Sequence, residues 1–173
     1  MNELIQSIQS RRSIRCYKRD PVPRELIDQV AQAGTYAPTA MGEQSPIILA
    51  VTDQTVRDQL SRLNAQVMGG MLEDPFYGAP AVLVVLADKS KPNHLYDGTL
   101  VMANLMLAAH ALGLGSCWVH RAKEVFEMPE GKALLASLGI QGEYEGIGHC
   151  ILGYPDGPTP QPAPRKENYI YHI

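Results

Sequence analysis

The stretch at residues 97–115, "DGTLVMANLMLAAHALGLG", constrains the fold most, because it is a helix-forming segment that is apolar on almost every side. A helix of this kind is normally buried at the centre of a domain or in an interface between chains. Its apolar run is interrupted by Asn104, His110 and Gly113, so the continuous part is too short to span a bilayer. We therefore expect a buried central helix in a chain that does not enter a membrane.

The rest of the chain supplies strands and further helices that could cover such a helix. Short apolar runs rich in β-branched residues predict four strands, at residues 46–52, 80–88, 116–120 and 146–155. Apolar residues at helical spacing predict three more helices: one ending just before Arg11, one within residues 20–38, and one within residues 53–70 with Asp53 as its N-cap. Strands and helices alternate, so the expected class is α/β or α+β, built as a layered sandwich.

Length, charge and cysteine content limit the classes of protein and partner. The 173 residues suit one domain, 1–173, with a substantial core. The formal net charge is −3, whereas a general binder of nucleic acid or of an anionic membrane usually carries a basic excess. The sequence has three cysteines, which is an odd number, and they show no C-x-x-C spacing. Its first ten residues, "MNELIQSIQS", lack the apolar core that a signal peptide has. We therefore expect free thiols and a cytoplasmic location.

The C-terminal segment, residues 155–173, differs in composition from the rest. "GYPDGPTPQPAPRK" has five prolines between Pro155 and Pro164, so it cannot be a helix or a central strand and should run as an extended arm. The tail "ENYIYHI" then alternates apolar and polar residues, which is typical of a strand. An extended arm that ends in such a strand favours docking on the sheet edge of a neighbouring chain.

The most concentrated charge lies in "RRSIR" at residues 11–15. Guanidinium groups bind a phosphate through paired hydrogen bonds, and a serine hydroxyl can donate one more. In an extended segment Arg11, Ser13 and Arg15 would point to one side and Arg12 to the other. Two interpretations stay open from these residues alone: a phosphate cradle, or a solvated basic turn that suits the C-terminus of the preceding helix.

Three other motifs could line a site, although each also has a simpler interpretation. "APTAMGEQSP" at 37–46 is a loop of small residues, through which backbone amides could approach a flat ligand. "GLGSCWVHR" at 113–121 contains the only tryptophan, which could stack on a ring system or fill the core. "PRK" at 164–166 is either a solvated charge pair or a second contact to the same anion.

Common catalytic and metal-binding patterns are absent from the sequence. It contains no G-x-S-x-G, P-loop, H-E-x-x-H or dinucleotide glycine fingerprint, and its five histidines lack metal-ligand spacing. No pair of side chains stands out as an acid and base or as a nucleophile and base. If the protein is an enzyme, a cofactor should therefore carry the chemistry while the chain positions it.

The order of these motifs resembles that of the nitroreductase family of FMN-dependent oxidoreductases. The similarity extends from Ile8 to Lys166. The motifs that carry it are "SRRSIRCY", "YAPTAMGEQSP", "DPFYGAPAVLVVLAD", "HLYDGTLVMANLMLAAHALGLGSCWVH" and "GYPDGPTPQPAPRK". No single motif decides the matter, but all five occur in the family's order.

The resemblance implies an α+β fold with a central mixed, mainly antiparallel sheet flanked by helices. It implies a homodimer with two FMN sites at the interface and with each C-terminal arm swapped onto the partner. It also implies that hydride passes from NADH or NADPH through FMN to a flat, electron-poor small molecule such as a nitroaromatic or a quinone. The chemistry would take place at N5 of the flavin, with no catalytic side chain and no metal.

Four segments match the family's flavin-contacting positions. Their matching residues are Arg11, Arg12, Ser13, Arg15, Pro38, Thr39, Ala40, Met41, Gln44, Trp118, Val119, His120, Arg165 and Lys166. By resemblance, residues 11–15 would hold the phosphate and the polar edge of the flavin, with Arg12 in a supporting role. Residues 38–41 would reach FMN from the other subunit, residues 118–120 would run along the ring, and residues 165–166 would lie near the phosphate.

This chain also departs from the family's pattern. Gly42 stands where an asparagine is common, Pro46 where an aromatic residue is common and Ala103 where a glutamine often occurs. His120 and Arg121 follow the tryptophan, where glycines are common. These positions border the flavin and the substrate cavity, so they leave other reactions on the same fold open, such as enone reduction and reductive dehalogenation.

Two interpretations without this chemistry also stay open. One is a flavin-binding redox module that turns over little. The other is a nucleic-acid binder that uses residues 11–15, against which the acidic net charge argues.

Overall fold

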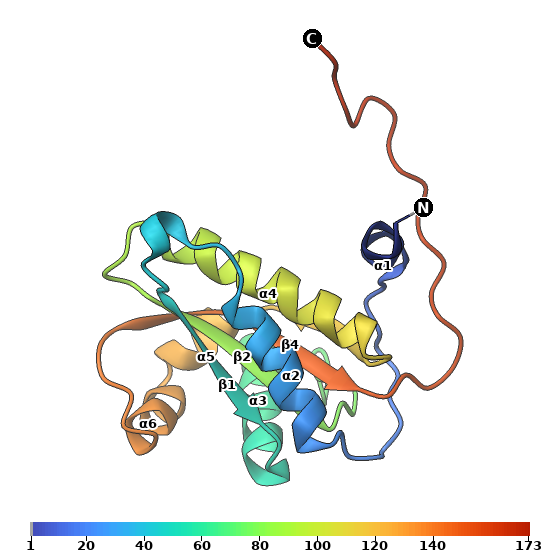
Figure 1. The fold of residues 1–173 in the computed structure, drawn as a ribbon. Helices are drawn as coiled ribbons and strands as arrows, with labels where there is room; N and C mark the ends of the chain where they lie inside the picture. The colour runs from blue at the N-terminus through green and yellow to red at the C-terminus, as the bar shows by residue number, and fades with distance from the viewer. Residues whose placement is uncertain (1) are drawn as a thin grey trace.

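The computed structural model describes residues 2–173 and has a four-stranded sheet at its centre (Figure 1). The strands are β1 (Pro46–Val51), β2 (Ala81–Asp88), β3 (Gly115–Val119) and β4 (Tyr144–Gly153). Their order across the sheet is β1-β2-β4-β3, and every neighbouring pair is antiparallel. An isolated bridge between Ser13 and Ser116 adds a parallel element beside β3. The predicted α+β class with a mainly antiparallel sheet is confirmed.

Helices cover both faces of the sheet. They are α1 (Glu3–Ser10), α2 (Arg24–Thr35), α3 (Gln54–Val67), α4 (His94–Ala111), α5 (Ala122–Glu127) and α6 (Pro129–Ser137), with a short 3₁₀ turn η1 (Ala40–Gly42). α2 and α4 pack on one face, whereas α3, α5 and α6 pack on the other. The result is a three-layer arrangement.

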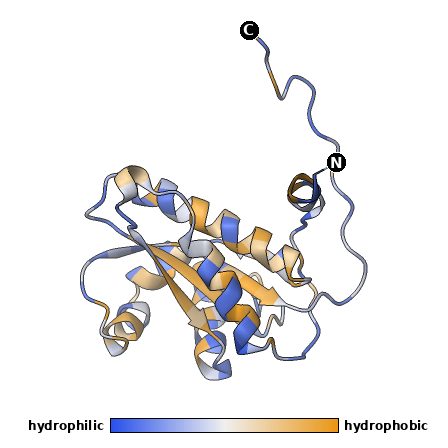
Figure 2. Cartoon of the chain, viewed as in Figure 1, coloured by the Kyte–Doolittle hydropathy of each residue, from blue (hydrophilic) through white to orange (hydrophobic). Residues whose placement is uncertain are grey.

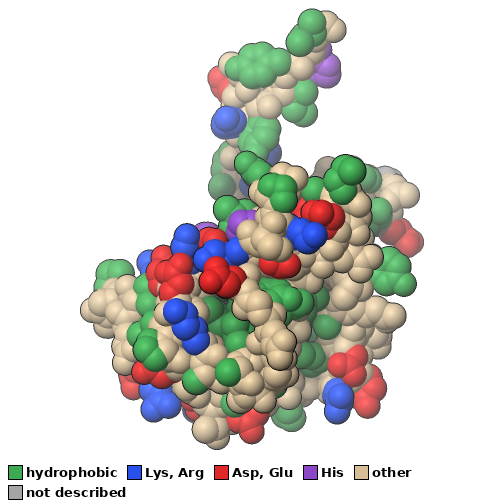
Figure 3. Space-filling model, turned by 90° about the vertical axis from the view of Figure 1, so that its left-hand side faces the viewer, with side chains coloured by type: hydrophobic (Ala, Val, Ile, Leu, Met, Phe, Trp, Pro, Cys, Tyr) green, Lys and Arg blue, Asp and Glu red, His purple; other side chains and the backbone are tan. Residues whose placement is uncertain are grey.

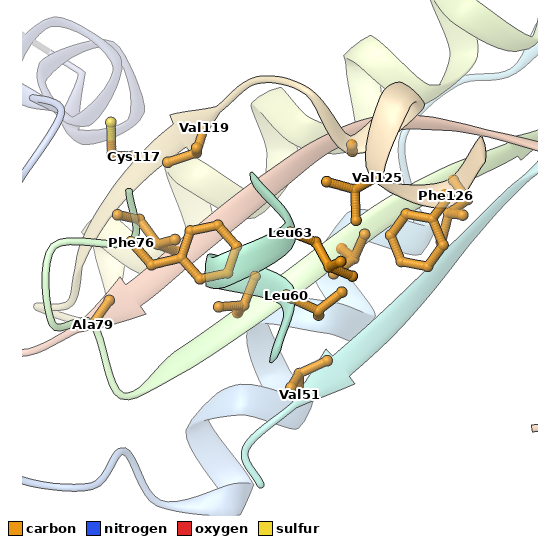
Figure 4. Close-up of a cluster of buried hydrophobic side chains, with 14 of the residues drawn as sticks. Val51, Leu60, Leu63, Phe76, Ala79, Cys117, Val119, Val125 and Phe126 are labelled. Atoms are coloured by element: carbon orange, nitrogen blue, oxygen red, sulfur yellow. The ribbon is translucent and has the colours of Figure 1, made fainter. Parts of the chain in front are cut away.

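β2 shows why the sheet is buried on both faces. Val82, Val84 and Leu86 belong to the apolar cluster under α3 and α5, while Leu83 and Val85 belong to the cluster under α4. All five are fully buried. Side chains alternate across a strand, so a run without polar residues is required when both faces are covered. Figure 4 shows part of the first cluster, with side chains from the strands, α3 and α5 converging on a shared interior.

α4 is buried along one side only. Val101, Met102 and Leu105 face the sheet and are almost inaccessible to solvent. On the other side of the same helix, Leu95 and Tyr96 are exposed. The predicted central helix is therefore present, but in one chain part of its apolar surface has no cover.

Local signals predicted the positions of α2 and α3. Asp53 is the N-cap of α3, because its Oδ1 accepts the backbone N–H of Val56 at 2.9 Å. Gly34 lies in the last turn of α2, at its contact with α4. A Cβ at this position would lie 2.6 Å from Cδ2 of Leu105, so the glycine permits close packing of the two helices.

The C-terminal arm leaves the body after β4 and projects away from it (Figure 1). Residues 161–173 are exposed throughout and contain neither a helix nor a strand. The arm is drawn mostly in hydrophilic and intermediate colours in Figure 2, in contrast to the apolar strands. The predicted extended arm is present, and its terminal tail does not form a strand within its own chain.

Candidate functional site

Main-chain pairing fixes residues 11–15 against the end of the sheet. The backbone N–H of Ile14 donates to the carbonyl of Ser116 at 2.9 Å, next to the bridge between Ser13 and Ser116. The buried hydroxyl of Tyr17 donates to the carbonyl of Ile14 at 2.6 Å. Burial raises the pKa of Tyr17, which keeps this hydroxyl protonated as a donor. The segment therefore lies alongside β3, joined to it by one isolated bridge.

The arginines of this segment have different surroundings. Nη1 of Arg12 donates to the carbonyls of Gln9 and Arg11, both at 2.7 Å, and so satisfies the end of α1. Arg15 is exposed and lines a recess of about 240 Å³ with Ser13 and the first residues of the arm. Nη1 of Arg12 thus serves the C-terminus of the preceding helix, whereas Arg15 and Ser13 share a recess that could hold an anion.

Two buried arginine nitrogens have no hydrogen-bond partner among the described residues: Nη1 of Arg11 and Nε of Arg12. Close by, Oγ of Ser10 lies 2.8 Å from Nε2 of His110, at the C-terminal end of α4. Burial lowers the pKa of His110, and the charges of Arg11 and Arg12 lower it further. The neighbourhood is therefore electropositive and contains unused donors, which is the environment that a phosphate would complete.

One carboxylate holds the loop at residues 38–44. Asp97, buried in the first turn of α4, accepts the backbone N–H of Ala40 at 2.9 Å and the hydroxyl of Ser45 at 3.0 Å. Lys91 adds an ion pair to Glu43 at 3.2 Å. Figure 3 views the molecule from this end and shows acidic and basic side chains next to one another.

The same loop presents its tip to solvent. Met41 is 95% exposed and has a φ of 55°, in the left-handed region. Thr39 and Gln44 line a pocket of about 380 Å³, together with residues of α2 and with Pro46, one of the positions that departs from the family. Within one chain the loop therefore ends on an open surface and makes no contact with residues 11–15.

The distance along α4 explains this separation. The loop is attached at Asp97 and the 11–15 segment at His110, so they lie at opposite ends of the helix (Figure 1). At 1.5 Å per residue, the two attachment points are about 20 Å apart. Arg165 and Lys166 lie on the projecting arm, where Arg165 donates to the carbonyl of Ala163 at 2.8 Å. A single chain thus leaves three of the four predicted segments apart.

The fourth segment ends β3. Trp118 is half-buried and packs over Gly148, where a Cβ would lie 2.5 Å from its Nε1. Its ring lies 5.5 Å from that of the exposed His120. Both residues line a pocket of about 480 Å³ between the start of α4 and the start of α5. Trp118 therefore fills the core with one side and borders a cavity with the other.

The sequence reasoning missed buried polar residues that support these segments. Nδ2 of Asn64 in α3 donates to the carbonyl of His120 at 2.7 Å and lies 3.5 Å from Nδ1 of His149. His149 is fully buried, and burial lowers its pKa to about 4. The available signals were weak: Asn64 falls on the apolar face of its helix, and Asp97 is a lone acid at the start of an apolar segment.

The structure also bears on other classes of site. Among residues 2–173, no helix is long and apolar enough to cross a membrane. The same part of the chain contains no group of three or more histidine, cysteine or acidic residues placed to hold a metal ion.

Comparison with known proteins gives consistent matches. The model of the nitroreductase family matches residues 8–74 and 67–154. A protein of Archaeoglobus fulgidus named "Putative NADH dehydrogenase/NAD(P)H nitroreductase" is 32% identical over 160 residues, which cover 90% of this chain and 87% of the relative. A Thermotoga neapolitana protein named "Iodotyrosine deiodinase" is 25% identical over 186 residues, covering 96% of each chain.

Among solved structures, a Bacteroides fragilis nitroreductase crystallised with bound FMN superposes with a TM-score of 0.88. It is 26% identical in sequence, and the match covers 100% of both chains. The fold similarity therefore includes the C-terminal arm as well as the layered body.

Proposed function

This chain belongs to the nitroreductase family, and we infer from that membership that it is an FMN-dependent NAD(P)H oxidoreductase. We propose that its electron acceptor is a flat, electron-poor small molecule such as a nitroaromatic or a quinone. Bound FMN would supply the transfer of hydride from NADH or NADPH and of electrons to the acceptor. The residues of this chain would bind the flavin, orient it and keep the two substrates in reach.

One observation carries the assignment of the phosphate site: Nη1 of Arg11 and Nε of Arg12 are buried without a partner. Buried donors are almost always satisfied in a folded protein, so a missing acceptor is expected here. Arg15 and Ser13 border the adjoining recess and would add donors from its open side. A flavin phosphate fits this donor set, because guanidinium groups bind phosphate oxygens in pairs.

We propose that the isoalloxazine ring lies along residues 118–120. Trp118 and His120 border the 480 Å³ pocket, and Asn64 fixes the main chain between β3 and α5. In this arrangement a guanidinium near N1 would stabilise negative charge on the reduced ring, and Arg15 is the candidate by its position in the family's motif. No side chain needs to act as an acid or base.

We further propose that two chains form each site, in a homodimer. The loop at 38–44 lies about 20 Å from residues 11–15 along α4, whereas a partner chain could bring its own loop to them. The uncovered side of α4, with Leu95 and Tyr96 exposed, offers an apolar surface for that contact. The exposed tail carries Tyr169 and Tyr171 and would pair with the free edge of the partner's sheet.

Reductive dehalogenation is a second candidate reaction, favoured by the similarity to a protein named iodotyrosine deiodinase. A non-catalytic flavin-binding module is a third. Steady-state oxidation of NADH and NADPH with nitro, quinone, enone and halogenated acceptors separates the three.

The free thiols of Cys16, Cys117 and Cys150 support a proposed cytoplasmic location, because reducing compartments preserve thiols.

The test of the main proposal is the visible spectrum of the purified protein during an anaerobic titration with NADH or NADPH. We expect the absorption of bound, oxidised flavin, bleached by the nicotinamide and restored by a quinone. A protein that stays colourless after incubation with FMN would contradict the proposal. Arg62 is an exposed arginine outside all four segments, so Arg62→Gln serves as a control variant and should leave this spectrum unchanged.

A further inference from the structure

Arg121 has a backbone conformation that is unusual for a residue with a side chain. Its φ and ψ are 78° and 14°, in the left-handed region that favours glycine. The main chain around it is fixed from both sides: Asn64 binds the carbonyl of His120 at 2.7 Å, and the N–H of Val125 donates to the carbonyl of Arg121 at 3.0 Å. A strained residue that its surroundings hold in place often has a functional reason.

The side chain of Arg121 belongs to the pocket beside the proposed flavin ring. It lines the 480 Å³ cavity together with Trp118 and His120, the residues along which the ring is proposed to lie. Arg121 is only half-buried, so its guanidinium is accessible to a ligand. Among residues 2–173, no hydrogen bond or ion pair of this guanidinium is present.

The other charged groups of the pocket are mostly compensated. Glu145 is bound by Nζ of Lys123 at 3.0 Å and lies 3.4 Å from Nε2 of His94. Glu124 is exposed and makes no ion pair with Arg121 within 4 Å. The guanidinium of Arg121 is therefore the cation in this cavity that is free to meet a ligand, and Glu124 is the one group that would oppose an anion.

We propose that Arg121 determines acceptor specificity by binding a carboxylate on an aromatic electron acceptor. This inference rests on the proposed function, since it places the acceptor over the flavin in the 480 Å³ pocket. A planar guanidinium binds a planar carboxylate through two parallel hydrogen bonds, and this geometry suits an acid group attached to a flat ring. A neutral amide of the same shape cannot form that charged pair.

Binding of redox-inert analogues tests the proposal without turnover. Benzoate and benzamide have the same shape and differ in charge, and their dissociation constants follow from calorimetry on the FMN-loaded protein. We expect benzoate to bind more tightly, and Arg121→Gln to reduce the ratio of the two constants about tenfold, as for one hydrogen bond to a charged group that stays partly exposed. Arg121→Lys should keep much of the preference.

The same ratio is then measured in turnover, as kcat/KM for 4-nitrobenzoate against 4-nitrobenzamide. Arg121→Gln and Arg121→Gly should both lower it, whereas Glu124→Gln should raise it by removing the opposing charge. The glycine variant keeps the test usable if the glutamine variant folds poorly, because glycine suits this backbone conformation. Arg62→Gln should leave the ratio unchanged, and added salt should lower it in the parent protein.

Each outcome has a separate meaning. An unchanged ratio in both Arg121 variants overturns the proposal, as does a change confined to the preference for NADPH over NADH, which would assign Arg121 to the phosphate of the donor. If 4-nitrobenzamide is reduced normally while the ratio does not respond to Arg121, only this inference fails. If no flavin binds and no acceptor oxidises NAD(P)H, the proposed function fails instead.

Discussion

The two segments proposed to meet on one flavin, residues 11–15 and residues 38–44, are held in different ways. The first is held by the main chain, through the bond from Ile14 to Ser116 and the bridge at Ser13. The second depends on one side chain, the carboxylate of Asp97. Substitutions in the first segment should therefore change what it binds, while one substitution at Asp97 should change where the second segment lies.

The difference also concerns the number of chains in a site. Each segment is ordered within its own chain, yet α4 keeps them about 20 Å apart. If two chains form each site, as proposed, one chain carries two half-sites at opposite ends of a helix whose outer side is partly apolar and exposed. That arrangement would couple flavin binding to association of the two chains.

The largest expected effect is that of Asp97→Ala. It leaves the donors of Ala40 and Ser45 without their charged acceptor, so the free energy of unfolding should fall by about 3 kcal/mol, from two hydrogen bonds to a charged group. Urea denaturation measures this change, and FMN affinity should fall with it. Asp28→Ala is the control, because Asp28 is exposed in a surface pair with Arg24 and should contribute under about 0.5 kcal/mol.

Substitutions of Arg11 or Arg15 should weaken FMN binding without loosening the fold. Arg11→Ala or Arg15→Ala should each cost about 1.5–3 kcal/mol of binding free energy, the range for hydrogen bonds to charged groups. Arg12→Ala should cost less, because Nη1 of Arg12 is already bonded to the end of α1. Titration of apoprotein with FMN, followed by flavin fluorescence, measures all three. Unchanged affinity in both Arg11→Ala and Arg15→Ala refutes the phosphate assignment.

Acid should weaken the β3 side of the site through His149. Its pKa is about 4 in the folded protein, below the ordinary 6.5, because burial disfavours the charged ring. Between these values the unfolded chain binds a proton that the folded chain does not, so stability falls as the pH falls from about 6.5 towards 4. The slope from this group is at most about 1.4 kcal/mol per pH unit.

Comparison with His149→Leu isolates that contribution. Urea denaturation of both proteins across this pH range should give a shallower slope for the variant, with the difference absent above pH 7. Equal slopes would mean that His149 does not control the acid response.

The smallest expected effect is stabilisation by Arg121→Gly. Arg121 has a positive φ of 78°, which glycine adopts without a Cβ clash. Relief of this strain should raise the free energy of unfolding by about 1 kcal/mol. The conformational entropy that glycine adds to the unfolded chain offsets part of this gain, so the net stabilisation is smaller. Thermal denaturation measures the change, and a destabilised variant would show that the side chain of Arg121 has packing interactions that outweigh the strain.

Local patterns were sufficient to predict much of the fold. The apolar run of β2 and the N-cap at Asp53 each depend on residues that are close together in the sequence. Both could therefore be predicted from local sequence patterns. The short helices α5 and α6 were not predicted, since six and nine residues carry little periodic signal. The predicted central helix α4 is buried on one side only, and we propose that a partner chain covers the rest.

The supporting residues of the site could not be predicted in the same way. Asp97 binds groups 57 and 52 residues away in the sequence, and Asn64 binds a carbonyl 56 residues away. Such contacts exist only after the layers have packed. The flavin-contacting residues themselves were proposed from the resemblance to a family. The structure shows that two of them have different surroundings: Arg12 donates to the end of α1, and Arg15 lines the recess beside the arm.

Mixed dimers test the division of the site between chains most directly. Chains carrying Arg15→Ala and chains carrying Asp97→Ala are coexpressed with different tags, and the doubly tagged heterodimer is isolated for measurement of its FMN content. If residues 15 and 97 of different chains serve one site, symmetry places both defects in one site and leaves the other intact. The heterodimer should then bind one FMN with the parent affinity, at a concentration where neither variant homodimer binds any. A heterodimer that binds no more FMN than the homodimers would contradict a shared site.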